Sequence, residues 1–337
     1  MENRFIYNWE LIIKKPPVLL RALKNYLFLF MGGERLRSVE IDLGFGCQLN
    51  CKHCYASDLI NPKRKSMSLE EIRKSIDQCI GEGAIHFLIS GGEPLIHKQV
   101  FEVIKYINKK NAFSCLATNG VALNKESISK LKKSGLNIIE ISLDSSLREK
   151  HDKNRKRKGL YDHVLKATSM CKKQGITVFA SSVITNDNLN NNDLIDIIRL
   201  GKTRGIRTHL CFPVSMGNWR GKKALLTKKN KIKIKGLFKK EDIRCCEEGN
   251  YLKQGCSAGI EKICINPYGD VLPCPYIQAS FGNITKENLS NILRRMRQNK
   301  YFKKIDGPCL PAFNNQFIKE IMFKINKAKK RPLDLSE

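Results

Sequence analysis

Three cysteines lie close together near the start of the chain, and their spacing is typical of metal ligands. Cys47, Cys51 and Cys54 are separated by three and two residues, so their thiolates can converge on one side of a single loop as soft ligands for iron-sulfur or zinc. A structural zinc site normally needs a fourth nearby ligand, and His53 is poorly placed for chelation between Lys52 and Cys54. Three cysteines therefore favour an iron-sulfur cluster with one iron left open.

A glycine pair followed by an acid is the second chemical motif. Gly91, Gly92 and Glu93 stand in the sequence SGGEP. Glycine allows the backbone to approach a ligand closely, and exposed carbonyls with a carboxylate suit an ammonium group. A plain turn is the alternative, because glycine pairs are common in turns. We expect a ligand-binding turn, because the glycine pair follows the second predicted strand and the cysteine loop follows the first.

These motifs must be positioned by a repeating pattern of strands and helices. Apolar, β-rich runs predict six strands, at residues 39–43, 86–90, 113–118, 138–143, 177–185 and 207–212. Helical runs lie between them at residues 69–80, 99–108, 125–133, 161–173 and 192–202. Strands joined by helical crossovers lie parallel, and the site then gathers at their C-terminal ends. The sequence predicts an α/β fold, a partial (β/α)6 TIM-like barrel of parallel strands.

The cysteine motif resembles that of the radical S-adenosylmethionine (radical SAM) superfamily, and the resemblance covers about residues 38 to 310. Cys47, Cys51 and Cys54 match its C-x3-C-x2-C hallmark. His53 stands where an aromatic residue is usual, and Tyr55 follows the last cysteine, as in the peptide-modifying and related branches. The resemblance implies that the three cysteines hold a 4Fe-4S cluster that binds S-adenosylmethionine.

Further residues match positions that this family uses for S-adenosylmethionine. Residues 91–93 resemble the family's GGE motif, which approaches the amino group of the cofactor. A serine at the end of the fourth strand and a following arginine help to hold the cofactor, and an arginine offers the fork that a carboxylate needs. The other basic residues between positions 148 and 158 are interpreted as a solvated loop. The implied cofactor-binding residues are Gly91, Gly92, Glu93, Ser142 and Arg155.

A second group of cysteines lies towards the C-terminus. The pattern from Cys256 to Cys274 fits C-x12-G-x4-C and resembles the first half of a SPASM domain, whose cysteines hold an auxiliary 4Fe-4S cluster. Only Cys309 follows, which indicates the shortened Twitch form with one auxiliary cluster. The implied ligands are Cys246, Cys256, Cys274 and Cys309, with Cys245 or Cys264 as alternatives.

The motifs divide the chain into five segments. A helical extension covers residues 1–37, and the radical SAM core covers residues 38–212. A basic connector at 213–244 leads to the small cysteine-rich iron-sulfur domain at 245–310, and a basic C-terminal helix or tail covers 311–337.

The charge balance is strongly basic. The 337 residues contain 61 Lys and Arg against 32 Asp and Glu, a net charge of +29, which favours an anionic partner such as an acidic peptide, a phosphorylated sugar or lipid, or RNA. Abundant Lys, Asn and Ile also fit an AT-rich coding sequence, so charge alone does not indicate a nucleic-acid partner. Thirteen cysteines without a secretory leader indicate the cytoplasm. The apolar residues 28–31 allow peripheral contact with a membrane, although such a helix more often packs on its own domain.

The resemblance implies an enzyme that reductively cleaves S-adenosylmethionine to a 5′-deoxyadenosyl radical. This radical abstracts a hydrogen atom from a substrate carbon. A flavodoxin- or ferredoxin-type donor supplies the electron for the cleavage. The auxiliary cluster aids oxidation or substrate binding. The substrate is either a peptide, as for a maturase, or a lipid-linked or anionic small molecule. The alternative is a non-enzymatic zinc protein that binds nucleic acid, against which stand the βα repeat and the glycine turn.

Overall fold

A mostly parallel sheet forms the centre of the protein. The computed structural model describes residues 15–222, 225–240, 243–245, 251, 255–303 and 307–336, without the side chains of residues 239 and 240. The sheet has nine strands in the order β7-β6-β5-β4-β3-β2-β1-β8-β9. Its strands are β1 (Ser38–Asp42), β2 (His86–Ser90), β3 (Phe113–Thr118), β4 (Ile138–Ser142), β5 (Thr177–Val183), β6 (Arg207–Cys211), β7 (Ile243–Cys245), β8 (Lys262–Ile265) and β9 (Val271–Leu272). Strands β1 to β8 pair in parallel, and β9 turns back antiparallel on β8.

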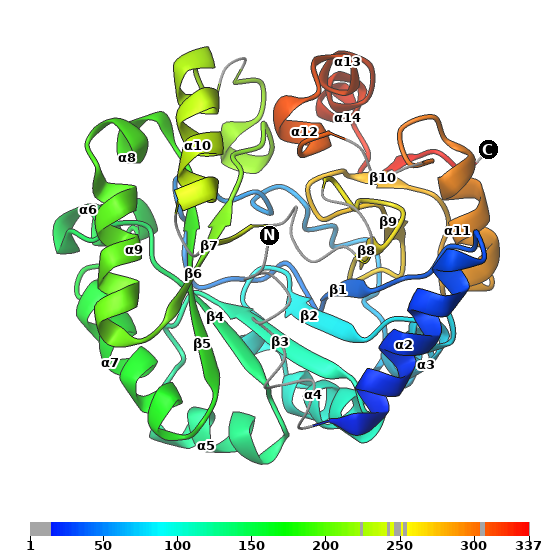
Figure 1. Ribbon diagram of the computed structural model, residues 1–337, viewed down its shortest axis with the longest axis horizontal. Coiled ribbons are helices and arrows are strands. Elements are labelled where there is room, and N and C mark those ends of the chain that lie inside the picture. Colours follow the sequence, from blue (N-terminus) through cyan, green and yellow to red (C-terminus); the bar gives the residue numbers. More distant parts are fainter. Residues whose placement is uncertain are drawn as a thin grey trace.

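Amphipathic helices connect the strands and cover the outer side of the sheet. They are α3 (Leu69–Gly81), α4 (Val100–Lys109), α5 (Lys125–Lys133), α6 (Arg148–Arg155), α7 (Leu160–Lys173), α8 (Asn186–Asn190) and α9 (Asp193–Arg204). Figure 1 shows α4, α5, α7 and α9 along the outer side of the strands. In α3, a capping box between Ser68 and Glu71 begins the helix, and Ile72 and Ile76 are buried against the sheet. The predicted α/β fold is confirmed, and the ends of the six predicted strands and five predicted helices differ by at most two residues.

Two features of the central region differ from the sequence-based expectation. Residues 148–155, expected in a solvated loop, form α6, because the helix buries His151 and Arg155 rather than an apolar face. The predicted connector contains α10 (Lys228–Lys240) and β7, whose Ile243 pairs with Thr208 of β6. On the other side, β8 of the predicted iron-sulfur domain pairs with β1. One sheet therefore crosses both expected domain boundaries.

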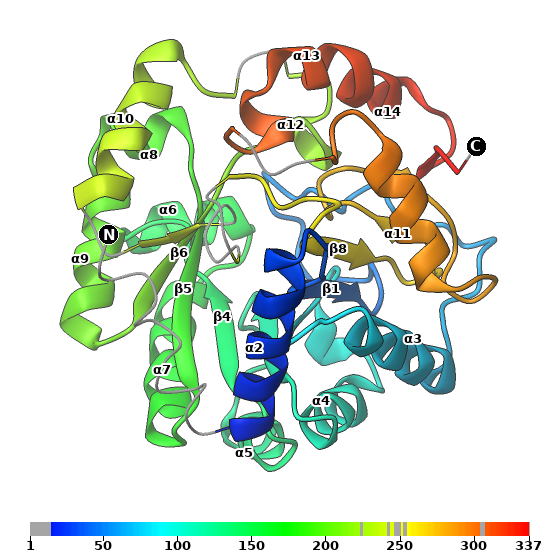
Figure 2. The same ribbon diagram turned by 45° about the vertical axis from the view of Figure 1, so that its right-hand side comes forward.

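Helix α2 (Pro16–Phe30) packs at the N-terminal ends of β2 and β3. Its Asn25 side chain is buried and donates hydrogen bonds to the Gly83 carbonyl at 2.8 Å and to the Tyr251 hydroxyl at 2.6 Å. Figure 2 shows α2, in dark blue, running from the region of α4 and α5 towards β8. Its outer face exposes large apolar side chains by 51 to 77 %, namely those of Leu20, Leu23, Leu27 and Phe30, with Met31 directly after the helix. Across the described ranges, no helix is long and apolar enough to span a membrane.

The C-terminal segments cover the opposite end of the molecule. Helix α11 (Leu289–Gln298) is followed by α12 (Leu310–Phe313), α13 (Asn315–Phe317), a π-helical turn at Ile318–Met322 and α14 (Phe323–Lys327). The chain then forms β11 (Leu333–Asp334), which pairs with β10 (Ala279–Ser280). In Figure 2, α13 and α14 lie at the end of the molecule opposite α4 and α5. The predicted basic tail is thus partly helical and returns to the iron-sulfur segment.

Replacing Asn25 by alanine should destabilise the barrel at its N-terminal end. The Gly83 carbonyl and the Tyr251 hydroxyl would lose a buried donor, which costs about 1–3 kcal/mol of the free energy of unfolding. Urea unfolding of anaerobic protein, followed by circular dichroism, measures the change. Lys24→Ala, an exposed position on the same helix, is the control and should change this free energy by less than about 0.5 kcal/mol. Equal unfolding midpoints for Asn25→Ala and wild type would contradict the assigned role.

Candidate functional site

A cavity of about 410 Å³ opens inside the barrel, at the C-terminal ends of the strands. Strands β1 to β6 and β8 all contribute side chains to its wall, as the topology of parallel strands requires. Seven of the eight residues predicted for the radical SAM core line it, namely Cys47, Cys51, Cys54, Gly91, Gly92, Ser142 and Arg155. The structure therefore brings together the cysteine loop, the glycine turn, the end of β4 and the end of α6.

The cysteine loop after β1 is held by neighbouring loops on two sides. The backbone N–H of Lys52 donates to the Asn154 carbonyl at 3.0 Å. Asn218 donates from its side chain to the Cys51 carbonyl at 2.7 Å and from its backbone to the Cys54 carbonyl at 3.0 Å. These bonds fix the backbone path of the loop that carries the three thiols.

The three thiols suit an iron-sulfur cluster by donor type. Cys47 is exposed, Cys51 is buried and Cys54 is half-buried, and burial raises the pKa of the last two. Among the described residues, no three histidine, cysteine or acidic side chains are close enough together to hold a single metal ion. A cluster of four irons is wider than one ion, and thiolates are its usual ligands. Cys47, Cys51 and Cys54, on the wall of one cavity, are the residues that would hold it.

The glycine turn after β2 packs directly on the segment that leads into the cysteines. The N–H of Gly92 donates to the Gly44 carbonyl at 2.8 Å, and the N–H of Glu93 donates to the Gly46 carbonyl at 2.9 Å. Gly91 has a φ of +125°, and a Cβ on Gly92 would overlap the Gly46 carbonyl oxygen. The sequence predicted close backbone approach to a ligand. The structure shows that the backbone of Gly91 and Gly92 lies closest to the backbone of residues 44–46. The turn also faces the cavity.

Glu93 differs from its predicted place, because its side chain does not line the cavity. It is 2 % exposed and accepts hydrogen bonds from the Thr118 hydroxyl at 2.8 Å, the Asn119 N–H at 2.7 Å and the Leu95 N–H at 3.1 Å. Burial raises the pKa of this carboxyl. Glu93 therefore ties the glycine turn to the turn after β3, and it positions both beside the cysteine loop.

Arg155 is anchored by a carboxylate that the sequence analysis did not single out. Its Nε and Nη2 donate to the two oxygens of Asp144 at 2.8 and 2.6 Å, and its Nη1 lies 3.7 Å from the Cys51 sulfur. Burial would lower the pKa of Arg155, but Asp144 and Cys51 raise it above its ordinary value. Two of the three guanidinium nitrogens of Arg155 are thus bound to Asp144, and the third, Nη1, faces the Cys51 thiol and the cavity.

Asp144 also links the cysteine loop to α6. Burial would raise its pKa, but Arg155 and His53 outweigh burial and hold the pKa at about 2. Its Oδ1 lies 3.6 Å from His53 Nε2, and its backbone N–H donates to His151 Nδ1 at 3.2 Å. The sequence feature that could have indicated this role is an acidic residue directly after a buried strand, followed by His151 and Arg155.

Two pairs of acidic and basic side chains lie on the wall of the cavity and were not predicted. Glu40 of β1 is 3.3 Å from Lys262 Nζ of β8, and Glu140 of β4 is 2.8 Å from His209 Nδ1 of β6. Burial would raise the pKa of Glu140, but His209 and nearby cations lower it to about 2. The sequence feature that could have indicated these pairs is an acidic residue in the middle of a buried strand, Glu40 in β1 and Glu140 in β4. We call the part of the cavity wall formed by the two pairs its polar floor.

The C-terminal cysteines lie in the segment around β8 and β9. Cys274 and Cys309 are buried and Cys256 is half-buried, and the Cys256 N–H donates to the Gly307 carbonyl at 3.2 Å. This bond brings the segments around Cys256 and Cys309 together. Burial raises the pKa of Cys274. The predicted ligand Cys246 lies outside the described residues.

The two alternative cysteines are both buried. Cys245 lies in β7, where it packs in the main hydrophobic core. Cys264 lies in β8, fully buried, and its thiol donates to Asp42 Oδ2 at 3.6 Å. The thiol of Cys264 is therefore engaged within the sheet, which does not favour it as a ligand.

Known protein families match two parts of the chain. Residues 41–201 match the radical SAM superfamily, and residues 256–315 match the iron-sulfur cluster-binding SPASM domain. The AdoMet-dependent heme synthase of Methanosarcina barkeri is 25% identical over 311 residues, which cover 81% of this chain and 88% of that protein. The antilisterial bacteriocin subtilosin biosynthesis protein AlbA of Bacillus subtilis is 28% identical over 270 residues, which cover 74% of this chain and 58% of AlbA. The crystal structure of Streptococcus suis SuiB bound to precursor peptide SuiA has a TM-score of 0.63 at 15% identity, over 80% of this chain and 66% of SuiB, and shows the shared fold.

Gly92→Ala should prevent cluster incorporation at the cysteine loop. The added Cβ would overlap the carbonyl oxygens of Gly46 and Phe45, so the loop would have to move. Iron and sulfide analysis after anaerobic reconstitution should show a loss of about four irons. Gly81→Ala is the matched control, because its Cβ would meet nothing within 4 Å, and it should keep the full iron content. Full iron in Gly92→Ala would show that the turn does not position the loop.

Proposed function

Since the chain belongs to the radical SAM superfamily and carries a SPASM domain, we propose that it abstracts a hydrogen atom from a substrate carbon after reductive cleavage of S-adenosylmethionine. The observation that carries this proposal is the single cavity that collects the three cysteines, the glycine turn, Ser142 and Arg155. When bound, the 4Fe-4S cluster and S-adenosylmethionine supply the electron and the carbon radical. The protein supplies position, charge and exclusion of water.

Membership of this superfamily overturns the alternative of a non-enzymatic zinc protein that binds nucleic acid. The matched domains imply 4Fe-4S clusters, and the relatives include enzymes such as the AdoMet-dependent heme synthase. The lysine-rich segments that suggested nucleic acid are partly ordered as α6 and α10.

Each cavity residue has a role in this proposal. Cys47, Cys51 and Cys54 hold the cluster. The backbone of Gly91 and Gly92 faces the same cavity, where exposed carbonyls suit the amino group of S-adenosylmethionine. Ser142 adds a hydroxyl at the end of β4, and Arg155 offers Nη1 to the cofactor carboxylate. Glu93 and Asp144 act through other residues, as positioning groups.

A peptide is the substrate class that we favour. The cavity floor combines the Glu40–Lys262 and Glu140–His209 pairs, so it suits a polar group such as a backbone amide or a polar side chain. AlbA acts in the biosynthesis of the bacteriocin subtilosin, and SuiB binds a precursor peptide. An anionic small molecule is the second candidate, because the AdoMet-dependent heme synthase aligns over most of both chains, and Lys262 offers a cation on the floor.

A lipid-linked substrate receives less support from the structure. The exposed apolar face of α2 lies at the N-terminal ends of β2 and β3, whereas the cavity opens at the C-terminal ends of the strands. A membrane bound at α2 would therefore not present its lipids to the cavity.

The auxiliary cluster is proposed to lie beside β8 and β9. Cys256, Cys274 and Cys309 supply three thiols, and Cys246 supplies the fourth. The Cys256–Gly307 backbone bond joins the first and last of these segments. Since Lys262 of the cavity floor belongs to the same segment, a cluster there would lie next to the substrate.

Cysteine substitutions should divide the iron content into two parts. Reconstituted wild type should hold about eight irons, and Cys47→Ala/Cys51→Ala/Cys54→Ala should hold about four. Cys309→Ala should also hold about four but should keep cleavage of S-adenosylmethionine. Cys79→Ala is the control, since Cys79 is buried in the apolar core and should keep all iron. A triple variant with undiminished iron would refute the ligand assignment.

Cleavage of S-adenosylmethionine tests the proposed reaction directly. With dithionite and no substrate, the wild type should release 5′-deoxyadenosine and methionine in equal amounts, measured by chromatography with mass detection. The triple cysteine variant should release no more than a protein-free control. If the fully reconstituted wild type gives no 5′-deoxyadenosine, the proposed function is wrong.

A further inference from the structure

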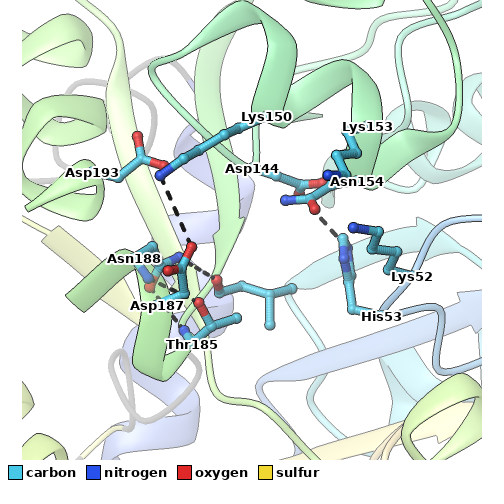
Figure 3. A pocket seen from close by; sticks show the side chains of 11 residues that line it. Lys52, His53, Asp144, Lys150, Lys153, Asn154, Thr185, Asp187, Asn188 and Asp193 are labelled. Atoms are coloured by element: carbon cyan, nitrogen blue, oxygen red, sulfur yellow. Dashed lines mark hydrogen bonds and ion pairs between the residues drawn. The ribbon is translucent and has the colours of Figure 1, made fainter. Parts of the chain in front are cut away.

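Five lysines surround two adjoining cavities beside the cysteine loop. The cavities have volumes of about 230 and 620 Å³ and share Lys52, His53, Asn154, Thr185 and Asp187. We call the lysines the lysine rim; they are Lys52, Lys150, Lys153, Lys156 and Lys222. Figure 3 shows Lys52, Lys150 and Lys153 around the smaller cavity. The lysines come from the cysteine loop, from α6 and the residue after it, and from the loop after Trp219.

The lysine rim is physically continuous with the proposed cluster site. Lys52 directly follows the proposed ligand Cys51, and its N–H donates to the carbonyl of Asn154, the residue after Lys153. His53, between Lys52 and Cys54, lines both cavities. A partner that binds the rim is therefore held next to the loop that carries the first three cysteines.

The charge of the rim is largely uncompensated. Asp144 binds Arg155, which leaves Asp187 and Asp193 as the carboxylates on the cavity wall that face the five rim lysines. Asp187 lies 4.0 Å from Lys150. Within the part of the chain that the structure describes, the exposed ammonium groups of Lys52, Lys153 and Lys156 form no ion pair. The rim thus presents excess positive charge to solvent.

We propose that the lysine rim is the docking surface for the acidic face of a flavodoxin-type electron-transfer protein. This inference rests on the proposed function, which needs one electron for each cleavage of S-adenosylmethionine. In the step, the reduced flavin of the partner is oxidised by one electron and the cluster is reduced by one electron, with no bond made or broken. Charge complementarity steers such encounters and raises their association rate, even where the contact is small and transient.

The position of the rim favours an electron donor over a substrate. The substrate cavity lies within the barrel and is lined by all strands from β1 to β6, whereas the rim lysines are mostly exposed. A macromolecular partner on the rim leaves the polar floor of the substrate cavity uncovered. The rim and that cavity meet at His53 and Trp219, so the donor would bind beside the cluster.

Charge reversal at three rim positions tests the proposal. The variant Lys150→Glu/Lys153→Glu/Lys222→Glu keeps Lys52 in the cysteine loop. It also keeps Lys156, whose φ of 54° ends α6 directly after Arg155. The matched control, Lys105→Glu/Lys109→Glu/Lys133→Glu, makes the same change of charge at exposed positions on α4 and α5. Purified flavodoxin is the probe, and its affinity is measured by isothermal titration calorimetry at low and high salt.

The rim variant should bind flavodoxin at least about tenfold more weakly than wild type at low salt, and its affinity should depend less on salt. Its flavodoxin-driven release of 5′-deoxyadenosine should fall by a similar factor, while dithionite-driven release stays at the wild-type level. The control variant should change affinity less than about twofold. Equal flavodoxin affinity in the rim variant and wild type overturns the proposal, even if affinity for RNA or anionic vesicles falls. If dithionite does not drive cleavage of S-adenosylmethionine in the wild type, the proposed function itself is wrong.

Discussion

The buried ion pair between Asp144 and Arg155 is the interaction on which the site depends. Removing two charges from water costs several kcal/mol for each ion, and a bidentate pair offsets that cost only if its geometry is maintained. The pair joins the end of β4 to α6, and its remaining contacts reach the cysteine loop at Cys51 and His53. The pair therefore sets the direction of Arg155 Nη1, and it adds side-chain contacts to the backbone bonds that hold the cysteine loop. The same helix carries Lys150 and Lys153, so this pair also fixes where positive charge stands around the loop.

The sequence was sufficient to predict the six core strands and five of the helices that connect them. Each has a clear apolar pattern that ends at glycine or polar residues. It failed at α6, whose buried side chains are His151 and Arg155, so no apolar periodicity exists to detect. It also missed β7 and the pairing of β8 with β1, since a strand of three or four residues acquires its partner from distant sequence. That the three cysteines line one cavity follows from their spacing in one loop. The partners of Glu93 do not, because Thr118 and Asn119 come from a neighbouring strand.

The barrel interior departs from the branched apolar filling that is common in such barrels. Glu40, Lys262, Glu140 and His209 form a polar floor, in which each acid is paired with a basic side chain from another strand. Buried charges are tolerated only when they are paired, so the pairs constrain one another across the sheet. A floor of this kind offers donors and acceptors to a substrate without carrying a large net charge. The lysines of the rim, in contrast, are mostly exposed to solvent.

The pairing of β1 with β8 has a consequence for how the protein is made. Strand β1 is synthesised before the partner for one of its edges, which follows about 220 residues later. At ribosomal speeds of about 5–20 residues per second, that edge waits for about 10–45 seconds in the nascent chain. An open strand edge is a site of mistaken pairing with other chains, which chaperones limit. The cysteine loop continues directly from this strand, so its support from β8 forms only after that later segment has been synthesised.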